Sequence, residues 1–194
     1  MGGSVSQPVE TRSLSKMSDS DAALVARTLA GDLDAYAALM SRYRDAFGRY
    51  AVHMLGNRED AQEAMQDSFV RAYRGLSRCR EPDRFGAWLF RIVVNRCRTA
   101  RRRLQRHRRF DADLPDDVPS KGSRPDAFEW RDEIARALSR LRPHYREAFL
   151  LRYVEELDYG EMAQVTGVKE PALRMRVKRA GDQLRDLLRG LHGS

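Results

Sequence analysis

Six polar residues recur at helical spacing in one arginine-rich stretch, and together they have the chemistry of a polyanion-binding surface. They follow one another at steps of three or four positions: Arg91, Asn95, Arg98, Arg102, Arg106 and Arg109. A helix places residues at such steps on one face. A helix over 84–109 would be about 39 Å long at 1.5 Å per residue. Its cations could displace counterions along roughly one turn of duplex.

Net charge is concentrated in the same region. The 194-residue chain has a net charge of +8, yet 71–109 holds fourteen arginines against Glu81 and Asp83, a local net charge of +12. A solvated arginine face is the usual explanation of a charge run. Over 84–109, however, the sequence offers no acidic partner for i,i+4 pairing. The clustering therefore favours a nucleic acid as the ligand.

A loop and a helix start precede the arginine ladder and combine cations with aromatic rings. Arg80 and Arg84 lie close in sequence to Phe85, Trp88 and Phe90. Aromatic and arginine side chains together suit the stacking of unpaired bases. The alternative is that Phe85 and Trp88 belong to the core, which we favour for Trp88. Cys79 in this loop is best explained as a small neutral residue.

The predicted helix over 59–76 has an acidic face away from its apolar stripe. Asp60, Glu63 and Asp67 share that face. An acid near a helix N-terminus complements the helix dipole, which accounts for Asp60. It does not account for Asp67, two turns further on. Acids beside a DNA-binding helix indicate a surface for another protein.

The C-terminal third contains a helix-turn-helix pattern from Asp158 to Leu188. Residues 158–161 form a capping box that starts a short helix. Gly167 makes the turn, and Pro171 suits the first turn of the next helix, where its missing N–H costs nothing. Basic residues at the start of a second helix commonly meet phosphates and base edges. Those expected to point outward are Arg174, Arg176, Lys178 and Arg179.

Enzymatic, metal and membrane chemistry are not expected. Cys79 and Cys97 lack CxxC spacing, and the four histidines are scattered without carboxylates at ligand spacing: His53, His107, His144 and His192. We therefore expect neither cofactor nor metal. No apolar run reaches membrane-spanning length, and residues 1–18 lack the hydrophobic stretch of a signal peptide. These features predict a cytoplasmic protein without membrane insertion.

The periodicities predict an all-α protein with two small helical domains. Residues 1–18 are polar and predict a disordered tail, 19–109 form the first domain, and 128–194 form the helix-turn-helix domain. Residues 110–127 are acidic and proline-containing, as in a flexible linker. With few apolar residues to dock the linker, we expect the domains to be held loosely. The linker's negative charge would lie transiently against the arginine face and weaken DNA binding by the free protein.

Two pairs of segments resemble a known family. Residues 60–74 (DAQEAMQDSFVRAYR) and 85–95 (FGAWLFRIVVN) are similar to the second region of bacterial sigma factors. Residues 141–153 (LRPHYREAFLLRY) and 159–168 (YGEMAQVTGV) are similar to their fourth. Possession of these two regions with a short linker resembles the extracytoplasmic-function (ECF) class. The resemblance covers about residues 20 to 190.

The resemblance implies a transcription initiation factor that binds core RNA polymerase, directs it to specific promoters and helps melt the minus-10 element. Core polymerase, through its clamp helices and flap, promoter DNA and an anti-sigma factor are the implied partners, and the free protein would be a monomer. The implied polymerase-binding residues are Asp60, Glu63, Gln66 and Asp67. Those implied for the minus-10 element are Cys79, Arg80, Arg84, Arg91, Asn95, Arg98 and Arg101. Those implied for the minus-35 element are Lys169, Pro171, Ala172, Arg174, Met175, Arg176, Lys178 and Arg179.

The recognition helix departs from the family pattern. The common Gly-Thr-Val-Lys-Ser-Arg run is replaced by residues 171–176 (PALRMR), so hydroxyls are lost at Ala172 and Met175. Promoter preference is therefore expected to be unusual. The alternative function is a helix-turn-helix repressor or activator acting without core polymerase. That alternative explains the second domain, leaves the first unexplained, and would usually be a dimer.

Overall fold

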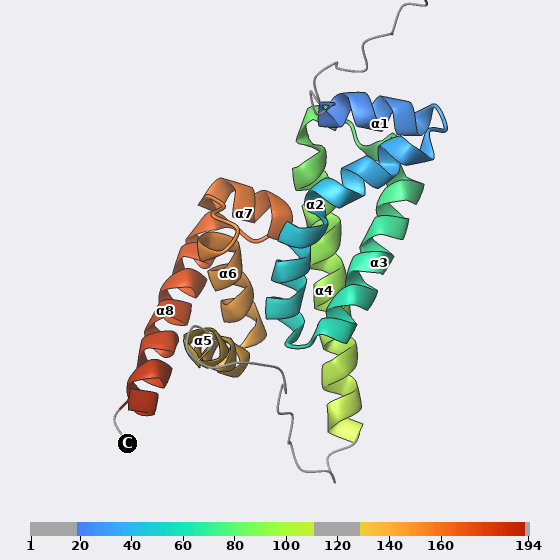
Figure 1. Ribbon diagram of the computed structural model, residues 1–194. Helices are drawn as coiled ribbons and strands as arrows, with labels where there is room; N and C mark the ends of the chain where they lie inside the picture. Colours follow the sequence, from blue (N-terminus) through green and yellow to red (C-terminus); the bar gives the residue numbers. More distant parts are fainter. Residues whose placement is uncertain (1–18, 111–128, 193–194) are drawn as a thin grey trace, which may run out of the picture.

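The structure is a computed structural model that describes residues 19–110 and 129–192, with side chains at 19–106, 134 and 136–189. Within these ranges the chain forms eight α-helices and two short 3₁₀ turns, with no strand. This confirms the predicted all-α class. The helices form two groups that lie side by side (Figure 1). The predicted tail over 1–18 and, apart from Phe110, the predicted linker lie outside the described residues.

The first group contains four helices, and the two predicted over 59–76 and 84–109 start within one residue of the expected positions. They are α1 (Asp21–Leu29), α2 (Leu33–Leu55), α3 (Arg58–Gly75) and α4 (Phe85–Phe110), with the 3₁₀ turns Leu76–Arg78 and Pro82–Arg84 between the last two. Asp32 caps α2 by accepting from the Ala35 N–H at 3.0 Å. Gly56 ends α2 with φ +87°, a left-handed conformation that glycine adopts without strain.

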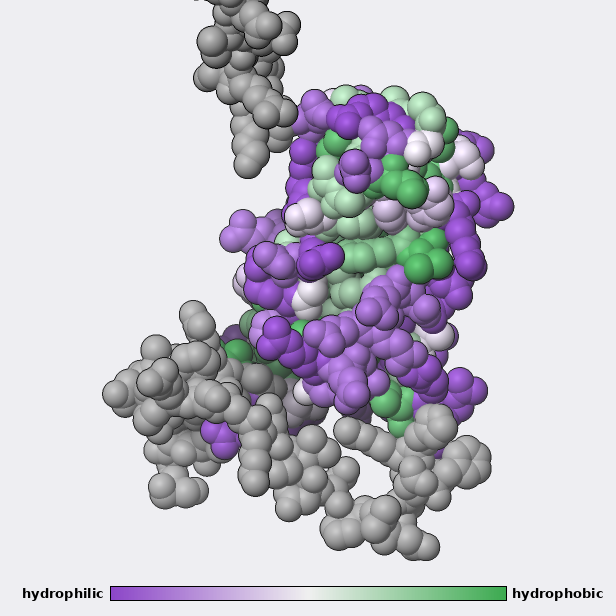
Figure 2. Space-filling model, turned by 45° about the vertical axis from the view of Figure 1, so that its right-hand side comes forward, coloured by the Kyte–Doolittle hydropathy of each residue, from purple (hydrophilic) through white to green (hydrophobic). Residues whose placement is uncertain are grey.

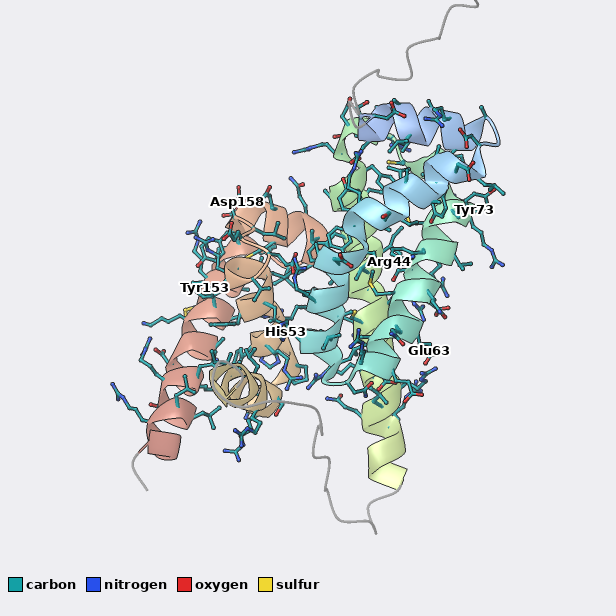
Figure 3. All side chains as sticks on the ribbon, in the orientation of Figure 1. Arg44, His53, Glu63, Tyr73, Tyr153 and Asp158 are labelled. Atoms are coloured by element: carbon teal, nitrogen blue, oxygen red, sulfur yellow. The ribbon has the colours of Figure 1, made fainter. Side chains whose placement is uncertain are left out.

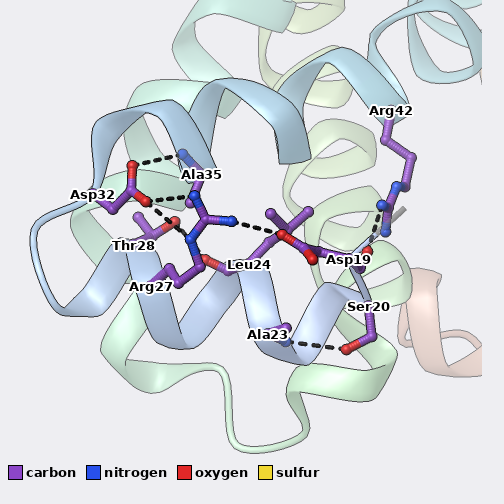
Figure 4. A network of polar contacts seen from close by, with 9 residues as sticks. All are labelled: Asp19, Ser20, Ala23, Leu24, Arg27, Thr28, Asp32, Ala35 and Arg42. Carbon is purple, nitrogen blue, oxygen red and sulfur yellow. Dashed lines mark hydrogen bonds and ion pairs between the residues drawn. The ribbon is translucent and has the colours of Figure 1, made fainter. Parts of the chain in front are cut away.

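A polar network fixes the corner between α1 and α2 (Figure 4). The Arg27 guanidinium lies between the Asp19 and Asp32 carboxylates, at 2.6 and 2.7 Å. Arg42 of α2 donates to the Asp19 carbonyl at 2.7 Å. Hydrogen bonds from the Ala35 N–H and then Arg27 hold the pKa of Asp32 below its ordinary value. The N-cap of α2 therefore also anchors α1.

Aromatic rings of α2 and α4 form the core of the first group. Phe47 stacks on Phe90 with centroids 4.7 Å apart, and Tyr50 meets Phe90 edge-on at 5.1 Å. Phe85 is fully buried, and Trp88 is partly buried. Phe85 and Phe90 are therefore core residues, and the idea that they stack on unpaired bases is wrong for this arrangement. The cause is that the apolar stripe of α4 continues from its first residue.

The second group contains the helix-turn-helix. Its helices are α5 (Glu129–Arg140), α6 (Pro143–Tyr153), α7 (Tyr159–Thr166) and α8 (Glu170–His192). Leu150, Leu151, Met162 and Leu173 are fully buried between α6, α7 and α8. Ile134 of α5, although apolar, is 45% exposed. Among the described side chains of α5, only Ala137 and Leu138 in its last turn are buried. Ile134, one turn earlier, lies outside this buried contact.

The two groups pack against each other, which differs from the expected loose arrangement. Helices α6 and α7 contact α2 and α4 (Figure 1). Arg146 of α6 is buried and donates to the Leu138 carbonyl at 2.6 Å and to the Met54 carbonyl at 3.3 Å. Met54 lies in the last turn of α2, where carbonyls lack helical partners and the helix dipole is negative. Burial lowers the pKa of Arg146 to about 9, so it stays charged at neutral pH.

A second titratable group lies near this interface, in the connection from α6 to α7. Burial raises the pKa of Glu155 to about 7, against the opposing effect of Arg49 on α2. A carboxyl whose pKa is raised on folding stabilises the fold below its ordinary pKa of about 4.3. That contribution disappears as the pH rises through the folded value near 7.

None of the helices, over the part of the chain described, has the length and apolar character needed to span a membrane.

Replacement of Gly86 by alanine is expected to destabilise the first group. A Cβ at Gly86 would lie 2.7 Å from the Tyr43 hydroxyl oxygen, and that hydroxyl donates to Asp21 of α1. Gly86→Ala should lower the free energy of unfolding in urea by about 1–3 kcal/mol. Gly48→Ala, inside α2 with open space around its Cβ, should raise it by roughly 0.5–1 kcal/mol. Equal stability of the Gly86 variant and the parent would contradict this packing.

Glu155→Gln is expected to flatten the pH dependence of stability. In the parent, the free energy of unfolding should fall between pH 5 and pH 8, because the buried carboxyl must ionise over that range. The variant cannot ionise at this position, so its stability should change less. Urea unfolding of the full chain at both pH values measures the difference. Glu156→Gln, at an exposed neighbour, should keep the parental profile; an unchanged slope in Glu155→Gln would refute the assignment.

Candidate nucleic-acid interface

Helix α4 presents most of its predicted basic ladder to solvent. Arg91, Asn95, Arg102 and Arg106 are exposed along it, and the side chain of Arg109 lies outside those described. The opposite side of α4 holds fully buried residues, among them Val93, Val94 and Cys97. One helix thus supplies both the core of the first group and a cationic outer face.

The loop before α4 divides its three candidate residues. Arg80 and Arg84 are exposed, and Arg84 lies 3.5 Å from Glu81. Cys79 is buried, with its Sγ 3.7 Å from the Glu81 carbonyl oxygen. Burial raises the pKa of the Cys79 thiol, which makes the thiol less reactive. The two arginines can meet a ligand in this arrangement, whereas Cys79 supports the loop from within.

Arg98 faces the second group of helices. Its Nε and Nη2 donate to the two carboxylate oxygens of Glu147 on α6, at 2.6 and 2.9 Å. Its Nη1 donates to the carbonyl of Thr166, the last residue of α7, at 3.1 Å. Glu147 is 4% exposed, and its hydrogen bonds raise the pKa of Arg98. Such a two-pronged pair is among the stronger polar contacts in proteins. Arg98 is therefore occupied by the helix-turn-helix domain.

Arg101, one turn further along α4, is also engaged. Its Nη1 donates to the Met54 carbonyl at 2.6 Å, the same oxygen that receives Arg146 from α6. Guanidinium groups from both domains thus converge on the carboxyl end of α2. The structure brings Arg98 and Arg101 to the domain interface. Arg80, Arg84, Arg91 and Asn95 stay on the surface.

The acidic face of α3 pairs with arginines of α4. Glu63 receives two hydrogen bonds from Arg103, at 3.0 and 2.7 Å, and Asp67 receives one from Arg96 at 3.0 Å. Glu63 lies on the outer side of α3 (Figure 3). Its hydrogen bonds with Arg103 lower its pKa. The side chains of both acids remain about half exposed, at 55% and 52%. The absence of acids from the α4 run therefore did not mean absence of partners, because α3 supplies them.

The other two predicted residues of the α3 face lie on either side of this pairing. Asp60 is in the first turn of α3, and its N–H is capped by Asn57 at 2.7 Å. Gln66 is exposed and lines an open groove of about 830 Å³ between α2 and α3. Val52, Met65 and Phe69 give the groove apolar walls, and Arg44, Arg49 and Arg58 add cations. The face that includes α3 shows a hydrophobic band bordered by hydrophilic side chains (Figure 2).

The second domain forms the helix-turn-helix that the sequence predicted, although Arg176, expected to point outward, is partly buried. Asp158 accepts from the Glu161 N–H at 2.8 Å, and Glu161 accepts from the Asp158 N–H at 2.9 Å, which confirms the capping box. Gly167 turns the chain with φ +71°. The start of α8 then presents exposed residues to solvent: Lys169, Pro171, Ala172, Arg174, Met175, Lys178 and Arg179. Arg176 is partly buried, and Arg179 donates to the Tyr145 hydroxyl at 3.2 Å.

Two family models match this chain in the order of its two domains. The model described as Sigma-70 region 2 matches residues 39–107, and Sigma-70, region 4 matches residues 131–184. The first contains α3, the loop and most of α4. The second contains α6, α7 and the recognition part of α8.

Individual proteins agree with the family models. ECF RNA polymerase sigma factor SigM of Mycobacterium tuberculosis is 34% identical over 169 residues, 87% of this chain and 85% of SigM. ECF RNA polymerase sigma factor SigE of Mycolicibacterium smegmatis is 34% identical over 77% of this chain, which spans 60% of the length of SigE. The structure of CnrH in complex with the cytosolic domain of CnrY superposes with a TM-score of 0.66 at 28% identity, covering 89% of this chain and 99% of that one.

The order of the two regions, the identity to full-length relatives and the shared fold lead to one assignment. Sigma factors are a family of regulatory factors rather than of enzymes. The chain belongs to the ECF sigma factors, the transcription initiation factors that work with bacterial RNA polymerase at specific promoters.

Proposed function

We propose that this sigma factor holds a promoter at two points and helps to separate the DNA strands at the minus-10 element. The observation that supports it best is the placement of two cationic surfaces on two separate domains. One runs along α4 and the preceding loop, and the other is the start of α8. Arg80, Arg84, Arg91 and Asn95 would contact the opened minus-10 strand, joined by Arg98 and Arg101 once these are released.

The minus-35 element would be bound by the start of α8. Its proposed contacts are Lys169, Pro171, Ala172, Arg174, Met175, Arg176, Lys178 and Arg179. Basic residues here suit phosphates and base edges of a major groove. Because α7 supports α8 from behind through its buried Met162 and Val165, the exposed side of α8 remains free for DNA.

Polymerase would bind mainly through α3. Asp60, Glu63, Gln66 and Asp67 form the proposed contact for the clamp helices, beside the α2–α3 groove. Exposed ion pairs contribute about 0–1 kcal/mol, so Glu63 and Asp67 can exchange Arg103 and Arg96 for cations of polymerase at little cost. On the second domain, Tyr153 and Val154 are exposed apolar residues at the end of α6. They offer a separate apolar surface for the polymerase flap.

Promoter binding requires the two domains to separate. Helix α7 packs on both α4 and α8, so beside α7 the axes of these two DNA-binding helices lie about two helix spacings apart, roughly 20 Å at 8–10 Å each. The minus-10 and minus-35 elements are about 25 base pairs apart, roughly 85 Å at 3.4 Å per base pair. The packed arrangement is therefore the form of the free factor, and the Arg98–Glu147 pair must break on the promoter.

A regulatory partner is part of the proposal. CnrH was solved in complex with the cytosolic domain of CnrY, and by analogy we propose that an anti-sigma factor binds this chain. Its most effective site would be one that stabilises the packed domains, since that form cannot reach both promoter elements. We also propose that the factor works in the bacterial cytoplasm, as a monomer when free, and without catalysis of its own.

Charge reversal of the α3 face is expected to abolish polymerase binding. The acids are proposed to face a cationic surface of polymerase. Asp60→Lys, Glu63→Lys and Asp67→Lys together would place like charges against each other there, which costs several kcal/mol. Co-purification with core polymerase should be lost while circular dichroism reports unchanged helicity. Arg96→Gln with Arg103→Gln is the matched control. It breaks the same intramolecular pairs but leaves the acids free, so it should retain binding.

The same experiment separates the two candidate functions. A repressor or activator acting without polymerase would bind DNA through α8 and would have no use for the α3 face. Retained co-purification of the triple variant would argue against a polymerase contact at α3. Failure of the parent to support promoter-specific transcription with core polymerase would argue against the whole proposal.

Release of Arg98 is expected to strengthen DNA binding by the free factor. Glu147→Gln removes the counter-charge, so the domains should part more easily and expose Arg98. Affinity of the free protein for a single-stranded minus-10 oligonucleotide should rise about tenfold, as for a change of about 1.4 kcal/mol. Addition of Arg98→Ala should cancel the gain, and Glu156→Gln should show none. Identical affinities of Glu147→Gln and the parent would contradict the proposal that the Arg98–Glu147 pair limits DNA binding by the free factor.

A further inference from the structure

The guanidinium of Arg174 is held in place at the start of the recognition helix. Its Cζ lies 4.4 Å from the centroid of the Tyr159 ring on α7. Its Nη2 lies 3.1 Å from Glu170, one turn earlier on α8. A cation within about 6 Å of a ring face is attracted to it. The aromatic face and the carboxylate together fix both the plane and one edge of a side chain that is otherwise 60% exposed.

Tyr159 is itself fixed from three sides. It is the first residue of α7, directly after Asp158, whose capping box with Glu161 sets the start of that helix. Its ring packs partly buried against the domain core. Arg152 of α6 lies 5.8 Å from the same ring and donates to the Leu157 carbonyl at 3.4 Å. The ring therefore links α6, α7 and α8, and it is a rigid support for Arg174.

Among the arginines of this surface, which alone can form a two-pronged contact with a base, Arg174 is the best placed donor. Ala172 and Met175 have no side-chain hydrogen-bond donor. Arg176 is partly buried, and Arg179 donates to the Tyr145 hydroxyl. An arginine has five N–H donors, and Glu170 engages one edge. The remaining N–H groups suit the N7 and O6 acceptors of guanine, the commonest specific arginine contact in a major groove.

We propose that Arg174 is the specificity-determining residue for a guanine in the minus-35 element, with Tyr159 and Glu170 as its positioning residues. The inference rests on the proposed function and deepens it, since it names the base and the device that orients the side chain. A guanidinium already held in its binding orientation loses less conformational entropy when DNA arrives. This device replaces the hydroxyl contacts that Ala172 and Met175 cannot make.

Selection of DNA by the holoenzyme tests the proposal. Core polymerase carrying the full chain is incubated with a duplex promoter library randomised across the minus-35 element, and bound sequences are counted. The parent should favour guanine at one position by about five- to hundredfold. Arg174→Lys keeps the charge but should lose most of that preference at that position alone. Tyr159→Leu should weaken it, and Tyr159→Phe, which keeps the ring face, should restore it.

Arg185→Lys is the matched control, because Arg185 is an exposed arginine of the same helix paired with Asp182 at 3.0 Å. It should keep the parental base profile. An Arg174→Lys profile equal to the parental one, or equal losses in Tyr159→Leu and Tyr159→Phe, would overturn this proposal. The proposed function would stand in either case, because the parent holoenzyme would still select promoter sequences. A parent holoenzyme without any sequence selection would overturn the proposed function as well.

Discussion

Arg98 of α4 finds its counter-charge in the other domain, and the arrangement of the whole molecule depends on that ion pair. Both carboxylate oxygens of Glu147 and the terminal carbonyl of α7 are within hydrogen-bond distance of one guanidinium. Breaking a buried pair while both charges stay buried costs about 3–5 kcal/mol. The domains can part without that cost only if water or a new partner takes up each charge. In the function we propose, a DNA phosphate is that partner for Arg98, which would couple domain separation to DNA binding.

Two kinds of ion pair therefore have different parts in the proposed function. The carboxylates of Asp67 and Glu63 are about half exposed, whereas that of Glu147 is 6% exposed. The two exposed acids are therefore the ones suited to exchange their arginines for cations of polymerase. The Arg98–Glu147 pair is shielded and resists exchange. In the proposed function, polymerase would bind the packed form first, and its second contact together with the promoter would then open the domains.

Local sequence signals predicted the elements, and long-range pairing escaped them. Helix starts and the capping box at Asp158 depend on neighbours three or four positions away, so the sequence contains their full signal. Arg98 and Glu147 are 49 positions apart, and nothing near either one marks the other as its partner. The spacing of the arginines predicted a cationic face on α4, but it could not predict which of them pair with acids or carbonyls of other helices. The role of Tyr159 under Arg174 was missed for the same reason, since two helices must meet to create it.

Distance between the domains tests the central claim most directly. Fluorescent labels on cysteines introduced at Ser41 of α2 and Gln183 of α8, both exposed, would report it by energy transfer. The native Cys79 and Cys97 are buried and should not take up label. The account predicts a single short distance in the free factor and one longer by tens of ångströms in the complex with polymerase and promoter, since the promoter elements lie roughly 85 Å apart. An unchanged distance between the two states would contradict it.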